Sequence, residues 1–185
     1  KTMASICMLM LADRGLIDFA KPVRDYWPEF AANGKGEVLV SHVMSHQTGC
    51  SGFPQTITTA QLYDHDFCAN LLAEMTPWWK PGSAPGYHAI TQGTLQGELL
   101  RRVDGRTLGK FFQEEVAAPL GADFHIGLPS TEYDRVAELE PPEKSIDQIV
   151  EVEPDSIAAK TFKSCVLDGT ETGTTAWREA EIPAA

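Results

Sequence analysis

The stretch KTMASICMLMLADRGLIDFAKPVRDYWPEF, residues 1–30, decides the fold. Its first half carries a broad apolar face and ends at Gly15, a residue type that commonly follows the last turn of a helix. No polar leader precedes that face, so the pattern predicts a helix already in mid-course at Lys1, with more chain expected before it. Pro22 is placed to open a second, short helix, which Pro28 ends.

Apolar periodicity and capping residues predict further helices along the chain. They are expected over residues 42–45 after a cap at Ser41, 66–75 capped by Asp66, 88–103 closed by Gly105, 107–116 and 155–162. Residues 38–40 are expected to be a short extended piece and 124–128 a strand or extended segment, and the polar tail from Gly169 is expected to be loop. Residues 76–86 hold too many Pro and Gly for regular structure, which predicts a rigid surface loop that carries Trp78 and Trp79.

Composition limits the classes of partner. The 185 residues are 43% hydrophobic, enough for one buried core, and the net charge is −11 without any basic run. We therefore expect neither a nucleic acid nor a membrane as partner. Acidic residues gather between Glu132 and Asp155, which predicts a solvated, loop-rich segment. The four cysteines are widely spaced and indicate no disulfide framework, so a reducing, cytoplasmic location is expected.

Self-contained catalytic motifs are missing from the sequence. It has no G-x-S-x-G, no H-E-x-x-H, no G-x-x-x-x-G-K and no C-x-x-C. His42 and His46 stand four residues apart and could chelate a metal from a helix, but the predicted helix is very short and no third ligand is nearby. We expect no metal and no cofactor.

Five segments, taken in order, resemble the serine β-lactamase-like superfamily, in particular class C β-lactamases and family VIII carboxylesterases. In that family an S-x-x-K motif opens a long helix, and the pattern L-x-x-x-G-x-L-x-L-x-x-P-V follows it; this chain has Lys1 and then a match over residues 11–23. The further matching segments are YWPEF (26–30), SHQTGC (45–50), WKPG with GYHA (79–82 and 86–89) and VAAPLG (116–121). Gln47 and Cys50 depart from the family's S-H-T-S-G-L motif. The resemblance extends from Lys1 to about Pro129 and then fades.

The resemblance implies an α+β fold of the β-lactamase and transpeptidase type. Residues 1–129 are expected to form mostly the helical domain, with few short strands. Residues 130–185 are expected to form an irregular acidic segment that leads back to the α/β domain. The large antiparallel sheet of that family is built from segments outside this span, so N- and C-terminal segments of the same fold are expected as partners of this chain.

The resemblance also implies an acyl-transfer site in which Lys1 and Tyr87 are catalytic. Both would serve a serine three residues before Lys1, so the Lys1 amine and the Tyr87 hydroxyl are expected within ~3–6 Å of each other, beside a cleft bordered by the Trp78–Trp79 loop. The family's third motif, K-T-G or H-x-G, is not found; Lys160-Thr161-Phe162 lacks the glycine. The chain alone is therefore expected to be inactive.

The tyrosine motif here is Tyr87-His88-Ala89, where the β-lactamase branch has Y-x-N. In that branch the Asn amide binds the amide side chain of the lactam. Alanine cannot do so, which favours a carboxylesterase acting on a small-molecule ester. Trp78, Trp79 and His88 are assigned to substrate binding, although packing alone explains the two tryptophans about as well. Two alternatives stay open: a β-lactamase or D-Ala-D-Ala peptidase-like activity, and a catalytically dead binding module.

Overall fold

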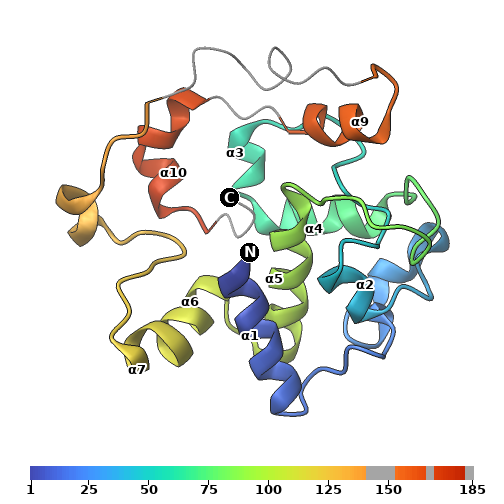
Figure 1. The fold of residues 1–185 in the computed structure, drawn as a ribbon, viewed down its shortest axis with the longest axis horizontal. Helices are drawn as coiled ribbons and strands as arrows, with labels where there is room; N and C mark the ends of the chain where they lie inside the picture. Colours follow the sequence, from blue (N-terminus) through green and yellow to red (C-terminus); the bar gives the residue numbers. More distant parts are fainter. Residues whose placement is uncertain (141–152, 166–168, 182–185) are drawn as a thin grey trace.

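The structure is a computed structural model that describes residues 1–140, 153–165 and 169–181. Helix α5 (Thr91–Asp104) lies at the centre of a helical assembly (Figure 1). It contacts α1 (Thr2–Asp13), α2 (Val40–Met44) and α4 (His65–Glu74), and α6 (Leu108–Phe112) packs against both α1 and α5. The chain therefore surrounds one long buried helix with shorter ones.

Several shorter elements complete the described chain. These are η1 (Val23–Asp25), η2 (Pro28–Gly34), α3 (Thr59–Leu62), a π-helical turn η3 (Gln113–Ala117), α7 (Ala118–Leu120), η4 (Ser130–Arg135), α9 (Ile157–Lys163), η5 (Gly169–Gly173) and α10 (Thr175–Glu179). Two isolated bridges, Pro22 with Leu39 and Ile57 with Cys165, are the β-pairings of the described residues. The mostly helical character predicted from the sequence is confirmed for that part of the chain.

Apolar burial fixes α1 against α5. Residues 91–100 of α5 are all buried, among them Leu95 and Leu99. They share one hydrophobic cluster with Cys7, Met8 and Leu11 of α1, all fully buried. Each large apolar side chain taken out of water contributes about 1.5–3 kcal/mol, so this contact holds α1 firmly and thereby sets the position of its N-terminal end.

A buried carboxylate ties α5 to α4. Glu98 is 1% exposed in its side chain and binds His65 of α4 at 3.0 Å, together with the Nε atoms of Arg101 and Arg102. Burial by itself raises the pKa of Glu98, but the hydrogen bonds from His65 and Arg102 and the charge of Arg101 outweigh it and bring the pKa to about 2. Glu98 thus stays ionised inside the fold, where its partners compensate for the lost water.

The helix boundaries correct the sequence predictions in places. The cap of α4 is Asp64, whose carboxylate accepts a hydrogen bond from the Phe67 N–H at 2.9 Å, two residues before the predicted Asp66. Helix α2 begins at Val40, where an extended piece and a cap at Ser41 were expected. Residues 124–128 form no strand, because their backbone has no ladder partner among the described residues. The tail holds α10, capped by Thr174, where only loop was expected.

Other predictions agree with the structure. Gly105 ends α5 in the left-handed region, with φ +89°, and Thr107 caps α6. All four cysteines are free and buried, so no disulfide staples the fold. Of the acidic segment predicted to be loop, residues 141–152 lie outside the described part of the chain. No helix among the described residues is long and apolar enough to cross a membrane.

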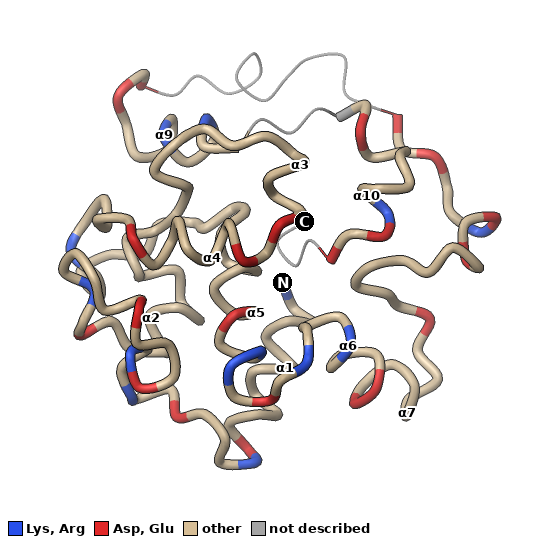
Figure 2. The backbone as a smooth tube through the Cα atoms, turned by 180° about the vertical axis from the view of Figure 1, so that it is seen from behind, with Lys and Arg blue, Asp and Glu red and all other residues tan. Residues whose placement is uncertain are grey.

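Charged residues of both signs are scattered along the backbone (Figure 2). Several arginines are held by carboxylates from distant segments: Arg14 by Glu115, Arg102 by Glu29, and Arg178 by Glu138. These pairs are partly exposed, and each contributes little to stability on its own.

Candidate active site

Lys1 stands at the N-cap of α1, and its carbonyl oxygen accepts a hydrogen bond from the Ser5 N–H at 2.9 Å. The Lys1 side chain extends to the Tyr87 loop. Its amine donates a hydrogen bond of 2.8 Å to the carbonyl oxygen of Ala89 and lies 5.3 Å from the centre of the Tyr87 ring. The structure therefore brings together the two residues that the sequence assigned to catalysis.

The loop that carries Tyr87 is fastened to the 46–49 loop by its backbone. Trp78 N–H donates to the Gly49 carbonyl at 2.8 Å, Gly82 N–H to Gln47 at 2.9 Å, and Gly86 N–H to His46 at 2.9 Å. At Gly49, φ is +80°, and a Cβ there would lie 2.6 Å from the Trp79 carbonyl oxygen. Only glycine permits both that conformation and that close approach. Residues 76–86 thus form the rigid loop that their Pro and Gly content predicted.

Tyr87 projects from this loop with 61% of its surface exposed. Its ring lies against the imidazole of His46, with the two ring centres 5.1 Å apart and the planes tilted by 44°. An exposed phenol, held beside an amine and an imidazole, is suited to exchange protons with a group that approaches from solvent.

His88, which the sequence assigned to substrate binding, is wholly buried. Its Nδ1 lies 2.5 Å from the Gly86 carbonyl, so Nδ1 carries the proton, and Nε2 accepts from the Thr48 hydroxyl at 2.6 Å. Burial lowers the pKa of His88 to about 4, with the neighbouring His46 acting in the same direction, although the Gly86 hydrogen bond opposes both. The prediction of direct substrate contact is therefore corrected: both ring nitrogens are occupied inside the protein, and His88 supports the loop from beneath.

The two tryptophans differ in environment. The Trp79 indole N–H donates to the Ala84 carbonyl at 2.9 Å, and its ring meets His88 edge-on at 5.9 Å. A Cβ on Gly86 would lie 2.6 Å from the Trp79 ring, so Trp79 packs closely on the residue before Tyr87. Trp78 packs instead on Gly52 at the hydrophobic core. Packing accounts for Trp78, whereas the Trp79 ring packs on Gly86 and His88, the two neighbours of Tyr87 in the chain.

A cavity of about 300 Å³ adjoins Lys1. Its walls are formed by Lys1, by two residues of α1 and by later segments: Met3, Ala4, residues 124–127, Val136, Ala137, Leu139, Thr172, Trp177, Arg178 and Ala180. Tyr87 and the two tryptophans are not among them. This cavity is a separate feature from the cleft expected beside the Trp78–Trp79 loop, which stays a prediction.

The two histidines considered as metal ligands have other partners. His42 Nδ1 accepts from the Leu39 N–H at 3.2 Å, and His46 Nδ1 accepts from the His88 N–H at 3.0 Å. These hydrogen bonds fix both rings within the protein. In each ring Nδ1 is occupied and is not available to a metal.

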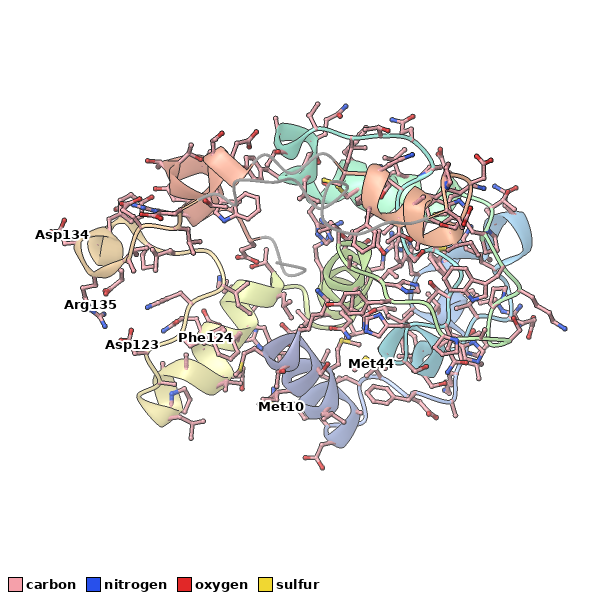
Figure 3. The ribbon with its side chains drawn as sticks, turned by 45° about the horizontal axis from the view of Figure 1, so that its top comes forward. Met10, Met44, Asp123, Phe124, Asp134 and Arg135 are labelled. Atoms are coloured by element: carbon pink, nitrogen blue, oxygen red, sulfur yellow. The ribbon has the colours of Figure 1, made fainter. Side chains whose placement is uncertain are left out.

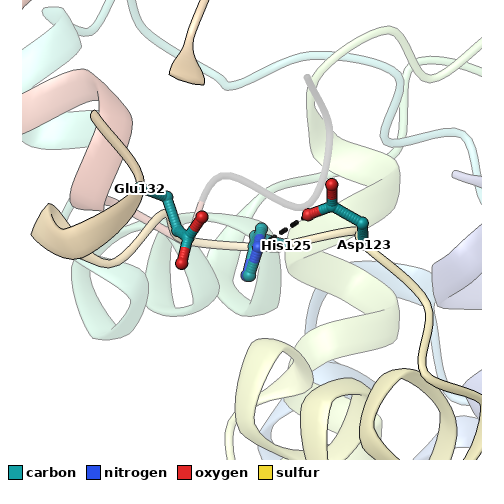
Figure 4. A group of neighbouring side chains, drawn as sticks. All are labelled: Asp123, His125 and Glu132. Atoms are coloured by element: carbon teal, nitrogen blue, oxygen red, sulfur yellow. Dashed lines mark ion pairs between the residues drawn. The ribbon is translucent and has the colours of Figure 1, made fainter. Parts of the chain in front are cut away.

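A different group has the spacing of metal ligands: Asp123, His125 and Glu132, each with one ligand atom within 4.8 Å of the others (Figure 4). Arg135 forms ion pairs with both carboxylates of this group. Figure 3 shows Asp123 and Arg135 at one edge of the molecule, apart from Met44 of α2. The guanidinium already supplies the positive charge that these carboxylates require.

Sequence reasoning missed the role of His46 and Thr48. Both lie in the SHQTGC segment, which was recognised as a match to a family loop, with His46 considered besides only as a metal ligand. His46 contacts Tyr87 and His88, and Thr48 holds His88 through its hydroxyl, which also accepts from the Cys50 N–H at 3.1 Å. The signal available was the match of this loop to a family motif; the partners themselves are more than thirty residues away.

A helical domain that presents a lysine at the start of one helix and a tyrosine from the loop above it defines the class as the serine β-lactamase-like superfamily. The chain belongs to the Beta-lactamase family, which it matches over residues 1–172.

Relatives include named esterases. The chain is similar to a family VIII carboxylesterase of known structure, at 42% identity and a TM-score of 0.84 over 98% of this chain and 48% of that one. It is also similar to EstA from Arthrobacter nitroguajacolicus Rue61a, at 33% identity and a TM-score of 0.86 over 98% and 49% of the two chains. A curated relative, the esterase/beta-lactamase LipL of Mycobacterium tuberculosis, is 38% identical over 169 residues, which are 90% of this chain and 36% of LipL. The chain thus spans about half of the solved relatives and about a third of LipL.

Proposed function

We propose that this chain supplies the lysine and tyrosine of a serine hydrolase that cleaves carboxylic esters through an acyl-enzyme. The nucleophile would be a serine three residues before Lys1, and a protein that contains this chain with that serine is called the serine-bearing protein below. One observation carries the proposal: the Lys1 amine lies 5.3 Å from the centre of the Tyr87 ring, although the two residues are far apart in the sequence.

In the proposed first step, the serine oxygen attacks the ester carbonyl carbon, and its proton passes to the Lys1–Tyr87 pair. Residues three apart on a helix share one face, so the serine would lie beside the Lys1 amine. The Ala89 carbonyl accepts one hydrogen bond from that amine and so orients it. When the carbon–oxygen bond to the alcohol breaks, the pair returns the proton to the leaving alkoxide, which departs as the alcohol.

In the second step, water attacks the acyl-serine. The Lys1–Tyr87 pair takes a proton from the water and returns it to the serine oxygen as the acyl–serine bond breaks, which releases the carboxylic acid. The pair ends in its starting protonation state, so no further reactant is needed. Tyr87 is exposed enough to meet both leaving group and water, which supports this role.

Esters are favoured over lactams by Ala89. Its methyl side chain offers no amide to hydrogen-bond an acylamino substituent, and its carbonyl is engaged by Lys1. An ester with a short acyl chain requires no such amide contact. The esterases among the relatives support the same choice at the level of the family.

The proposal is tested by comparing kcat/KM of the serine-bearing protein on p-nitrophenyl butyrate and on a chromogenic cephalosporin. We expect rapid ester hydrolysis and little lactam turnover. Faster lactam than ester turnover would replace the esterase with the β-lactamase alternative. No turnover of either substrate, together with no acyl adduct by mass spectrometry, would favour the alternative of a catalytically dead binding module.

A further inference from the structure

We propose that His46 is the residue that positions Tyr87, holding the loop on both sides of the tyrosine. The inference rests on the proposed function, because it assigns a task within the same site. His46 does not take part in the proton transfers described above; it acts through Tyr87.

His46 accepts two hydrogen bonds, one from each of the residues that flank Tyr87. The His46 carbonyl accepts from the Gly86 N–H at 2.9 Å, and the His46 Nδ1 accepts from the His88 N–H at 3.0 Å. Gly86 and His88 are the immediate neighbours of Tyr87 in the chain. The His46 ring also packs against the Tyr87 ring at 5.1 Å. One residue therefore fixes the backbone before Tyr87, the backbone after it and the side chain between them.

The backbone of His46 is in the left-handed region, with φ +60°, which few residues other than glycine adopt. Asn33 is the other non-glycine residue of the described chain with a positive φ. Strained conformations of this kind persist where surrounding structure enforces them, and they are concentrated at functional sites. At His46 the backbone carbonyl and the ring nitrogen both bind the 86–88 segment, and we attribute the unusual conformation to that double contact.

The direction of the second hydrogen bond defines the tautomer. Nδ1 must be unprotonated to accept from the His88 N–H, so the ring proton lies on Nε2. Adding a proton to Nδ1 would break this contact. The charged or titratable groups that face His46 are Lys1 of α1 and Tyr87 and His88 of the loop. Burial, and then the positive charge of Lys1, lower the pKa of His46 and keep it in the accepting form at neutral pH.

Substitutions separate the acceptor from the backbone conformation. His46→Asn keeps an acceptor at the place of Nδ1 and tolerates a positive φ. His46→Gly keeps the positive φ but has no side-chain acceptor. His46→Gln keeps an acceptor but moves it from the place of Nδ1 to the place of Nε2. In the serine-bearing protein we expect His46→Asn to stay within about threefold of the wild-type kcat. The Gly and Gln variants should lose about 10–100-fold in kcat with KM little changed, the scale of a misplaced catalytic group.

The pH profile gives a second readout. Wild-type kcat should fall on the acidic side as Nδ1 is protonated, and His46→Asn, which has no titrating ring, should lack that part of the fall. Equal losses of kcat in the Asn, Gly and Gln variants would show that the hydrogen-bond acceptor at the place of Nδ1 does not matter for activity, and would overturn the proposal. So would wild-type activity in both the Gly and the Gln variant.

A measurement that needs no activity separates this proposal from the esterase assignment. In protein labelled with 13C-tyrosine, the Tyr87 signal is identified by its loss in Tyr87→Phe. All three variants remove the imidazole that packs on the Tyr87 ring, so each shifts the signal and the readout is its line width. We expect a narrow signal in His46→Asn and a broadened one in His46→Gly and His46→Gln. An equally narrow signal in all three variants would refute the positioning role even if the wild-type protein hydrolyses no ester. A protein inactive on esters with the expected pattern of signals would refute only the esterase assignment.

Discussion

The amine of Lys1 and the carbonyl oxygen of Ala89 lie 2.8 Å apart, and this hydrogen bond joins the first turn of α1 to the end of the loop that carries Tyr87. Local periodicity cannot produce such a contact, since the two residues come from separate segments. It arises because α1 is packed on α5, and α5 begins at Thr91, just after the loop. The core helix thus sets the distance between the two residues proposed for catalysis.

The close approach at Gly49 predicts an unequal cost for two glycine substitutions. Gly49 and Gly105 both have φ between +80° and +89°, but a Cβ at Gly105 meets nothing within 4 Å, whereas one at Gly49 meets the Trp79 carbonyl and the Pro77 ring. Gly105→Ala should cost about 1–2 kcal/mol of unfolding free energy for its conformation alone. Gly49→Ala should cost about 1–3 kcal/mol more through overpacking. Urea unfolding of both variants checks this, and equal losses would mean that the two loops are not tightly apposed.

Buried neutral His88 predicts a pH-dependent stability. Its pKa in the folded state, about 4, lies below the ordinary value of 6.5. The stability it contributes is therefore fully present above pH 6.5 and is lost as the pH falls toward 4, because the unfolded chain binds the proton first. Between pH 7 and pH 5 the loss should be about 2 kcal/mol.

The comparison for this prediction is His88→Gln, which removes the titrating ring. Unfolding free energies of the variant should fall less between pH 7 and pH 5 than those of the wild-type protein, by that same ~2 kcal/mol. Because the other ionisable groups are shared, the difference between the two proteins isolates His88. Parallel pH dependences would show that His88 is not held neutral in the fold.

Local signals account for what the sequence predicted well. Thr107 marks a helix start through its hydroxyl, which accepts from the Lys110 N–H, and Gly105 marks a helix end through its backbone freedom. Neither depends on a distant partner, and the structure confirms both. The Pro and Gly of residues 76–86 likewise predicted a rigid loop. The resemblance to the β-lactamase family supplied the pairing of Lys1 and Tyr87, which no local pattern could give.

Long-range contacts account for what the sequence did not predict. The sequence predicted that His88 lies in a helix and binds substrate. Instead, the Thr48 hydroxyl and the Gly86 carbonyl hold its ring and keep the residue in the loop. Trp78 and Trp79 are adjacent and look equivalent in the sequence, yet the Trp79 ring packs on Gly86 and His88 whereas the Trp78 ring packs on Gly52. Residues 124–128 bend at Ile126 and Gly127 and contact α10 through a single hydrogen bond from the Leu128 N–H to the Arg178 carbonyl, so no strand forms.

The most direct test of a shared site for Lys1 and Tyr87 is a double-mutant cycle on ester hydrolysis by the serine-bearing protein. Tyr87→Phe keeps the ring and should leave the fold intact while reducing kcat by ~10²-fold or more, the scale of lost general acid–base help. Lys1→Met should cause a loss of similar size. If both residues serve one serine oxygen, the double variant should be little worse than the poorer single variant, since groups that act as a unit are strongly non-additive. Losses in kcat that multiply in the double variant, or a Tyr87→Phe variant within twofold of wild type, would contradict a shared site.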